Sequence, residues 1–247
     1  MKSHKKANDA IFTSFREAFN FDPELEHDFD SKTIFDSLFK ENELEPSEKF
    51  QDYCNNFEAL SIIQLKKSFY HFYINIQQES NEVFLKEKEL LSTQKTTIKD
   101  VLRSLDISIA HIIDRYLLEI LAYIRSVLYK NLGIKLFDVQ LIAGIKLYRK
   151  KILEIKTGEG KTFIIPIAAT LYGLRAKLLN RFIDEYNNMF KNGSDSNKSS
   201  WGKLEPFDIF QVKIVTANDY LARRDYSMLH SFYNFFNLTC YYIQETT

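Results

Sequence analysis

The chain has 247 residues, 45% hydrophobic and 15% aromatic, which excludes a disordered polypeptide because enough apolar surface is available for a folded core. Lysine plus arginine equals aspartate plus glutamate at 33 each, so the net charge indicates neither nucleic acid nor an anionic membrane as a partner. Cys54 and Cys240 lie far apart without a nearby histidine cluster, which disfavours a disulfide framework and a zinc site.

The first segment, residues 1–46, is predicted to be an acidic and partly flexible arm. Acidic side chains are frequent from Asp22 onward, and Pro23 interrupts any long helix. Short helices and a flexible arm both fit this pattern. Residues 1–19 contain lysines without an apolar run behind them, so we expect no signal peptide.

Residues 47–133 are predicted to form a helical lobe. Apolar side chains recur near helical spacing over 57–91, although the aromatic run 69–76 would also suit a strand. A second, continuous helix is expected to begin after Thr97, with an aspartate three residues later as in a capping box. Gly133 is the natural end of that helix.

In residues 134–247 the sequence pattern differs from that of the helical lobe and predicts alternating strands and helices. In chain order we expect a strand at 151–155, a helix at 162–189, an exposed loop at 191–203, a strand at 211–216, a helix at 220–236 and a strand at 238–243. Such alternation predicts an α/β fold, in which a parallel sheet with helical crossovers follows the N-terminal helical lobe. The longest uncharged stretch, 162–174, is too short to cross a bilayer, so no transmembrane helix is expected.

A glycine-rich turn between the first predicted strand and helix has the composition of a phosphate-binding loop. Its glycines let successive backbone N–H groups face an anion, and the following helix adds the positive end of its dipole. Lys161 would neutralise the β and γ phosphates, and the Thr162 hydroxyl would join the Mg²⁺ shell. The competing interpretation is a solvated turn. The nucleotide-binding residues of this hypothesis are Lys156, Thr157, Gly158, Glu159, Gly160, Lys161 and Thr162.

Three segments, taken together and in this order along the chain, resemble those of the SecA family of protein-export ATPases. They are Phe-Asp-Val-Gln-Leu-Ile-Ala-Gly at 137–144, Lys-Thr-Gly-Glu-Gly-Lys-Thr at 156–162, and Thr-Ala-Asn-Asp-Tyr-Leu-Ala-Arg-Arg-Asp at 216–225. The resemblance extends over about 118–243. It implies a partial P-loop nucleotide-binding domain, RecA-like and of helicase type, at 134–247.

The resemblance also implies roles for single residues and partners. Gln140 would read adenine, since its amide can pair with N6 and N7. Asn218, Asp219, Arg223 and Arg224 would belong to a segment that couples the nucleotide to the motor; alternatively, Asn218 or Asp219 only caps a helix and the arginines are solvated. The implied ligands are ATP and Mg²⁺, and the implied partners are an unfolded preprotein and a SecY-type membrane channel. A cytoplasmic location is expected, with peripheral membrane attachment left open.

The sequence departs from this family at the residues that hydrolyse ATP. Such motors use an Asp-Glu pair after a further strand, one carboxylate holding Mg²⁺ and the other preparing water. The only Asp-Glu step, Asp184-Glu185, lies inside a predicted helix, so no complete catalytic set is expected.

Two other functions remain open at this point. The unusual N-terminal helices could dock an unknown protein partner, with the motor remnant acting as a nucleotide sensor or a structural support. A nucleic-acid helicase shares the glycine-rich loop, but the balanced charge disfavours it, and no nucleic-acid partner is expected.

Overall fold

The computed structural model describes residues 46–92, 96–155, 160–192 and 210–243. The helices of this described part are α3 (Pro46–Glu58), α4 (Ile62–Ser92), α5 (Ile98–Arg115), α6 (Leu117–Leu132), α7 (Asp138–Tyr148), α8 (Lys161–Asn192) and α9 (Asp219–Phe235). The predicted arm at 1–46, apart from its last residue, and most of the predicted loop at 191–203 lie outside these residues.

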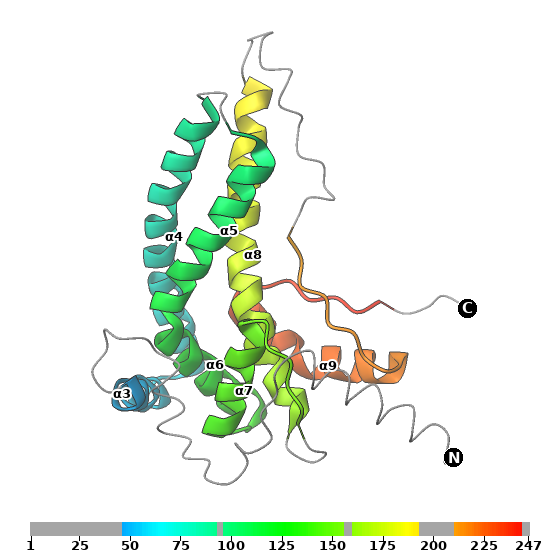
Figure 1. Cartoon of the computed structure of the whole chain (residues 1–247). Helices are drawn as coiled ribbons and strands as arrows, with labels where there is room; N and C mark the ends of the chain where they lie inside the picture. The colour runs from blue at the N-terminus through cyan, green and yellow to red at the C-terminus, as the bar shows by residue number, and fades with distance from the viewer. Residues whose placement is uncertain (1–45, 93–95, 156–159, 193–209, 244–247) are drawn as a thin grey trace, which may run out of the picture.

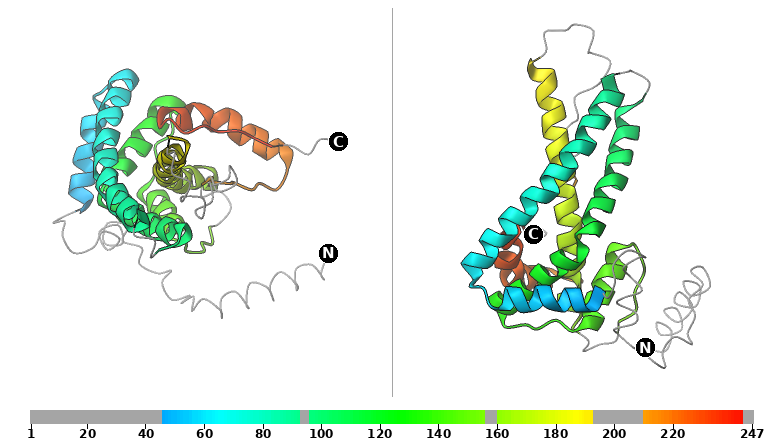
Figure 2. Two further views of the ribbon diagram at one scale, coloured as in Figure 1. Left: turned by 90° about the horizontal axis from the view of Figure 1, so that it is seen from above. Right: turned by 90° about the vertical axis from the view of Figure 1, so that its left-hand side faces the viewer.

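The three longest helices, α4, α5 and α8, run side by side as a bundle (Figures 1 and 2). The shorter helices α3, α6, α7 and α9 gather at one end of this bundle. There α3 packs on α6, α7 packs on α8, and α9 packs on both α6 and α8.

Aromatic side chains form the centre of the core where α4, α6 and α9 meet. The Phe69 ring is buried and lies 5.3 Å from Tyr123, 5.7 Å from Phe235 and 5.0 Å from Phe236, measured between ring centroids. Edge-to-face contacts of this kind add to the energy of apolar burial. They fix α9, which carries one of the sequence motifs, to the helices of the N-terminal half.

The predicted parallel sheet is wrong: no strand forms in the described part of the chain. The three segments expected as strands, 151–155, 211–216 and 238–243, are extended but make no backbone hydrogen bonds to one another. A strand exists only through its bonds to a neighbouring strand, and alternating apolar residues cannot supply that neighbour. Val215 and Ile243 accordingly remain 91% and 88% exposed.

Single residues define the start of α5 and the end of α6, as the sequence predicts. The Thr97 hydroxyl accepts the Asp100 N–H at 3.2 Å and begins α5, and Gly133 ends α6 with a left-handed φ of 68°. Reciprocal hydrogen bonds between Ser61 and Gln64 cap the first turn of α4, and the sequence analysis missed this cap.

The continuous helix expected after Thr97 is wrong, because it breaks at Tyr116. This residue has φ −96° and ψ 8°, between α5 in the bundle and α6 at its end. Apolar spacing continues through the break, so the hydrophobic pattern gives no sign of it. The aromatic run 69–76 is helical, as favoured, and the two helices expected at 162–189 and 220–236 are confirmed as α8 and α9.

Helix α8 is long and apolar enough over Lys161–Asn188 to cross a membrane, judged by length and composition. Inside the protein, 56% of the most apolar part of that stretch is buried. This burial is the behaviour of a core helix, whose apolar side chains face protein instead of lipid.

Candidate functional site

The predicted nucleotide site falls at the start of α8 and in α7. Residues 156–159 of the glycine-rich turn lie outside the described residues. The described members are Gly160, Lys161 and Thr162 at the first turn of α8, and Gln140 in α7.

The first turn of α8 has the features of an anion-binding helix start. Gly160 has φ +70°, a left-handed conformation that favours glycine, and its carbonyl accepts the Phe163 N–H at 3.0 Å. Lys161 is exposed and Thr162 is half-buried. The first N–H groups of any α-helix lack intrahelical acceptors and carry the positive end of its dipole, so this turn can hold a phosphate.

Gln140 is buried and lies directly against this turn. Its Oε1 accepts the Phe137 N–H at 3.0 Å, which caps α7. Its Nε2 faces Gly160 so closely that a Cβ added to the glycine would lie 2.4 Å away. The structure therefore brings together two predicted site residues that are separated in sequence, and it gives Gly160 a second reason to lack a side chain.

Contacts between α7 and α8 hold Gln140 in this position. A Cβ on Gly144 would lie 2.5 Å from Cγ2 of Ile167 and 2.6 Å from its Cβ, so the two helices approach at a glycine. At the other end of α7, the Tyr172 hydroxyl donates to the Tyr148 carbonyl at 2.7 Å. The sequence analysis missed Gly144 as a packing residue, although a glycine inside a helix is a signal for close approach.

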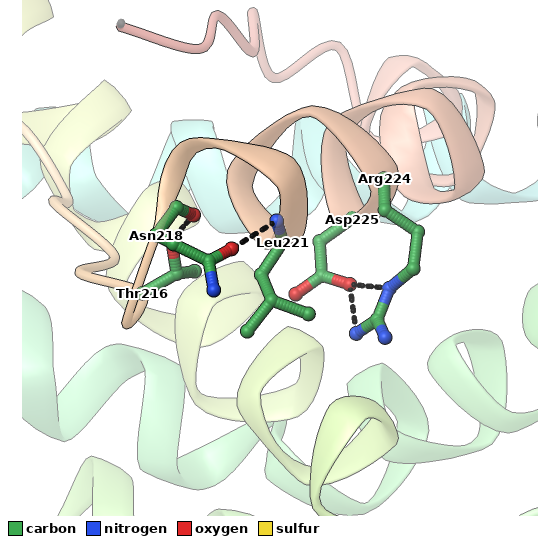
Figure 3. A network of polar contacts seen from close by, with 5 residues as sticks. All are labelled: Thr216, Asn218, Leu221, Arg224 and Asp225. Atoms are coloured by element: carbon green, nitrogen blue, oxygen red, sulfur yellow. Dashed lines mark hydrogen bonds and ion pairs between the residues drawn. The ribbon is translucent and has the colours of Figure 1, made fainter. Parts of the chain in front are cut away.

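A second group of predicted residues begins α9 (Figure 3). The Asn218 side chain accepts the Leu221 N–H at 2.9 Å, and Thr216 Oγ1 donates to the Asn218 carbonyl at 3.0 Å. Arg224 pairs with the adjacent Asp225, with Nη2 2.6 Å from Oδ1. Asn218 is therefore a helix cap, as the simpler interpretation expected.

The two groups of predicted residues do not touch through polar atoms. No hydrogen bond or ion pair within the described ranges joins the Asn218–Arg224 segment to Gln140, Lys161 or Thr162. Asp219 and Arg223 are exposed. The coupling role of this segment remains a prediction.

An ion pair between α5 and α8 lies near the end of α7 and was not predicted. Arg175 binds Asp106 through two nitrogens, with Nε 2.6 Å from Oδ1 and Nη2 2.5 Å from Oδ2. Burial raises the pKa of the nearby Asp114 carboxyl, against the opposing charge of Arg149. The two partners are 69 positions apart in the sequence, so no local signal indicates this pair.

The Asp184-Glu185 step is structural. Asp184 is exposed, and Glu185 binds Lys88 of α4 at 2.6 Å and Arg181 at 3.2 Å. Among the described residues, no group of three histidine, cysteine, aspartate or glutamate side chains could hold a metal ion.

Comparison with known proteins connects this arrangement to a family. The family model of the SecA DEAD-like domain matches residues 56–180 and 206–247. The match begins upstream of the resemblance seen in the motifs, and it omits 181–205, which includes the predicted surface loop. No solved structure matches the chain.

Relatives of the chain are protein translocase subunits named SecA. The chain is 36% identical over 132 residues to that of Thermodesulfovibrio yellowstonii and 32% identical over 164 residues to that of Lawsonia intracellularis, covering 53% and 65% of this chain. A chloroplastic SecA of Ostreococcus lucimarinus is 33% identical over 131 residues, or 53% of this chain. The aligned regions span only 11%, 15% and 10% of these relatives' own lengths.

The family match includes α4 through most of α8, the motif at the start of α9 and both sides of the Gln140–Gly160 contact. Since it extends over more than half of the chain, the chain belongs to the SecA DEAD-like domain family.

Proposed function

We propose that this chain binds ATP with Mg²⁺ at the start of α8, as the nucleotide-gripping part of a SecA-type protein-transport motor. The observation that carries the proposal is the contact between the Gln140 amide and the left-handed Gly160 at the beginning of a long helix. This contact supports the proposal because it joins the side chain expected to read the base to the turn expected to hold the phosphates.

The residues present fit the nucleotide. Gly160 lets the Gln140 amide approach the turn, since a Cβ there would lie 2.4 Å from Gln140 Nε2. Lys161 is exposed at the same turn, and the first N–H groups of α8 lack intrahelical acceptors. When bound, ATP would supply a phosphoanhydride bond whose hydrolysis drives movement in the family. Binding alone needs only the loop, the helix start and one cation.

Each residue has a distinct part in this proposal. Lys161 would neutralise phosphate charge, the Thr162 hydroxyl would coordinate Mg²⁺, and Gln140 would select adenine. The loop residues Lys156, Thr157, Gly158 and Glu159 would complete the backbone nest around the phosphates. In the α9 segment, the Asn218 cap would set the position of Asp219, Arg223 and Arg224.

The wider role is protein transport. The relatives are named protein translocase subunits, which supports an unfolded preprotein and a SecY-type channel as partners of the complete motor. A cytoplasmic protein that attaches peripherally to a membrane suits this role.

Calorimetry with ATP and Mg²⁺ tests the proposal on the full chain. We expect Lys161→Ala to weaken ATP binding at least tenfold, because an ammonium within reach of a phosphate is lost. Lys86→Ala removes an exposed lysine from α4 and should leave the affinity within twofold. Equal heats for wild type and Lys161→Ala, or tighter binding of GTP than of ATP, would overturn it.

A further inference from the structure

A cavity of about 370 Å³ lies between α4 and α6, away from the residues proposed to bind ATP. The residues of its lining that bear on its chemistry are Ser68, His71, Phe72, Tyr116, Glu119 and Tyr123. This volume is at the lower end of the range for small-ligand sites and suits one long side chain.

Aromatic rings form the walls of this cavity and hold one another in place. The Phe72 ring lies 5.6 Å from Tyr116 and 5.3 Å from Tyr123, between centroids. The Tyr123 hydroxyl is hydrogen-bonded to Ser68 Oγ at 2.8 Å, so it is already paired within the protein. Phe72 and Tyr123 are themselves buried, so Tyr116, which is half-buried, is the ring that these walls offer to a ligand.

Glu119 is the acidic member of the lining. It is half-buried, and within the described residues no hydrogen bond or ion pair reaches its carboxylate. Burial raises the pKa of Glu119 to about 7, and the charge of Lys49 in α3 only partly opposes this rise. A half-buried carboxylate that makes no hydrogen bond or ion pair is costly, and an incoming cation would lower that cost.

We propose that this cavity binds the cationic end of a lysine or arginine side chain from a partner polypeptide. An aromatic wall attracts a cation through its quadrupole, and a carboxylate at the same cavity supplies the opposite charge. An anionic ligand would be repelled by Glu119, and a neutral one would leave the carboxylate unpaired. The cavity is separate from the residues proposed to bind ATP, since it shares no residue with the α8 turn.

NMR titration of the full chain with blocked amino-acid amides provides the test. We expect Nα-acetyl-lysine amide and Nα-acetyl-arginine amide to shift the resonances of Tyr116 and Glu119, and Nα-acetyl-norleucine amide to have no effect. Glu119→Gln should lower the affinity for the cationic probes at least fivefold. Glu82→Gln removes an exposed carboxylate elsewhere on α4 and should change the affinity less than twofold.

A second variant and a second probe make the result decisive. Tyr116→Leu keeps an apolar side chain at the cavity but removes its π face, so it should also weaken the binding of the cationic probes. A Gly-Ser-Lys-Ser-Gly peptide should bind more tightly than methylammonium. Equal binding of the norleucine probe, an unchanged affinity in Glu119→Gln, or equal binding of methylammonium and the peptide would overturn the proposal. ATP calorimetry should be the same for Glu119→Gln and wild type, so failure here would leave the nucleotide proposal standing.

Discussion

At the scale of single residues, Glu119 makes the stability of the fold depend on pH. Its folded pKa of about 7 lies above the ordinary glutamate value of 4.5, so the folded state binds a proton more strongly than the unfolded state. The resulting stability is present below pH 4.5 and is lost as pH rises through about 7. With a discount for solvent screening, we expect a loss of about 1 kcal/mol, or roughly 3 °C in Tm.

Thermal unfolding of Glu119→Gln between pH 5 and pH 8 measures this effect. Because the amide cannot ionise, the variant should melt at a higher temperature than wild type at pH 8, and the two should converge near pH 5. Glu82→Gln serves as the control and should follow the wild-type pH profile. A parallel profile for Glu119→Gln and wild type would show that Glu119 titrates normally.

Gly160 and Gly133 allow backbone strain to be separated from a role in the nucleotide site. Both have left-handed φ values, +70° and +68°, so alanine at either position should cost about 1 kcal/mol. Only at Gly160 would the new Cβ meet a neighbour, the Gln140 amide; at Gly133 nothing lies within 4 Å. We expect the Tm of both variants to fall by a similar amount. Calorimetry should show a loss of ATP binding only for Gly160→Ala. Equal ATP affinities would mean that the Gln140–Gly160 contact is only structural.

At the scale of elements, the approach of α7 to α8 depends on Gly144. An alanine Cβ there would meet the branched Cβ of Ile167, which cannot rotate away. The free-energy cost of this overpacking should exceed the gain from the higher helix propensity of alanine. We expect Gly144→Ala to destabilise the fold by about 1–2 kcal/mol. Gly173→Ala in α8 meets only the flexible end of Leu238 and should be near neutral. Chemical denaturation of both variants compares them, and a larger loss for Gly173→Ala would contradict this packing argument.

Helix ends in this protein were predictable because their causes are local. The side chains of Thr97 and Asn218 each accept a backbone N–H three residues on, and so begin α5 and α9. Gly133 ends α6 through its left-handed backbone and its own N–H. The break at Tyr116 has no such signal. It depends on how α5 and α6 pack in the assembled bundle.

The absence of a sheet could not be predicted, because whether a segment forms a strand depends on distant partners. Phe210, at the edge of one expected strand, is bound instead by Asn180 of α8, whose side chain accepts its N–H at 2.8 Å and donates to its carbonyl at 2.9 Å. For the site, the glycine-rich turn and Gln140 were identifiable from sequence. Their contact was not, because it depends on the α7–α8 packing at Gly144.

At the scale of the whole molecule, ion pairs between distant segments hold the bundle together. Asp106 and Arg175 join α5 to α8, and Lys88 and Glu185 join α4 to α8. These pairs are half-buried, so their contribution to stability lies between that of exposed and buried pairs. Helix α8 is therefore joined to α4 and α5 by charge as well as by its apolar face.

The ion pairs of Glu185 also bear on catalysis. We expect the chain alone to bind ATP without hydrolysing it appreciably. Glu185 is held by Lys88 and Arg181, far along α8 from its first turn, so it is not placed to prepare water near Lys161. Phosphate release from MgATP should not exceed that of Lys161→Ala. Glu185→Gln should lower the thermal stability by breaking the contact with Lys88, and it should leave any residual release unchanged. A release rate that both Lys161→Ala and Glu185→Gln abolish would instead make Glu185 a catalytic residue.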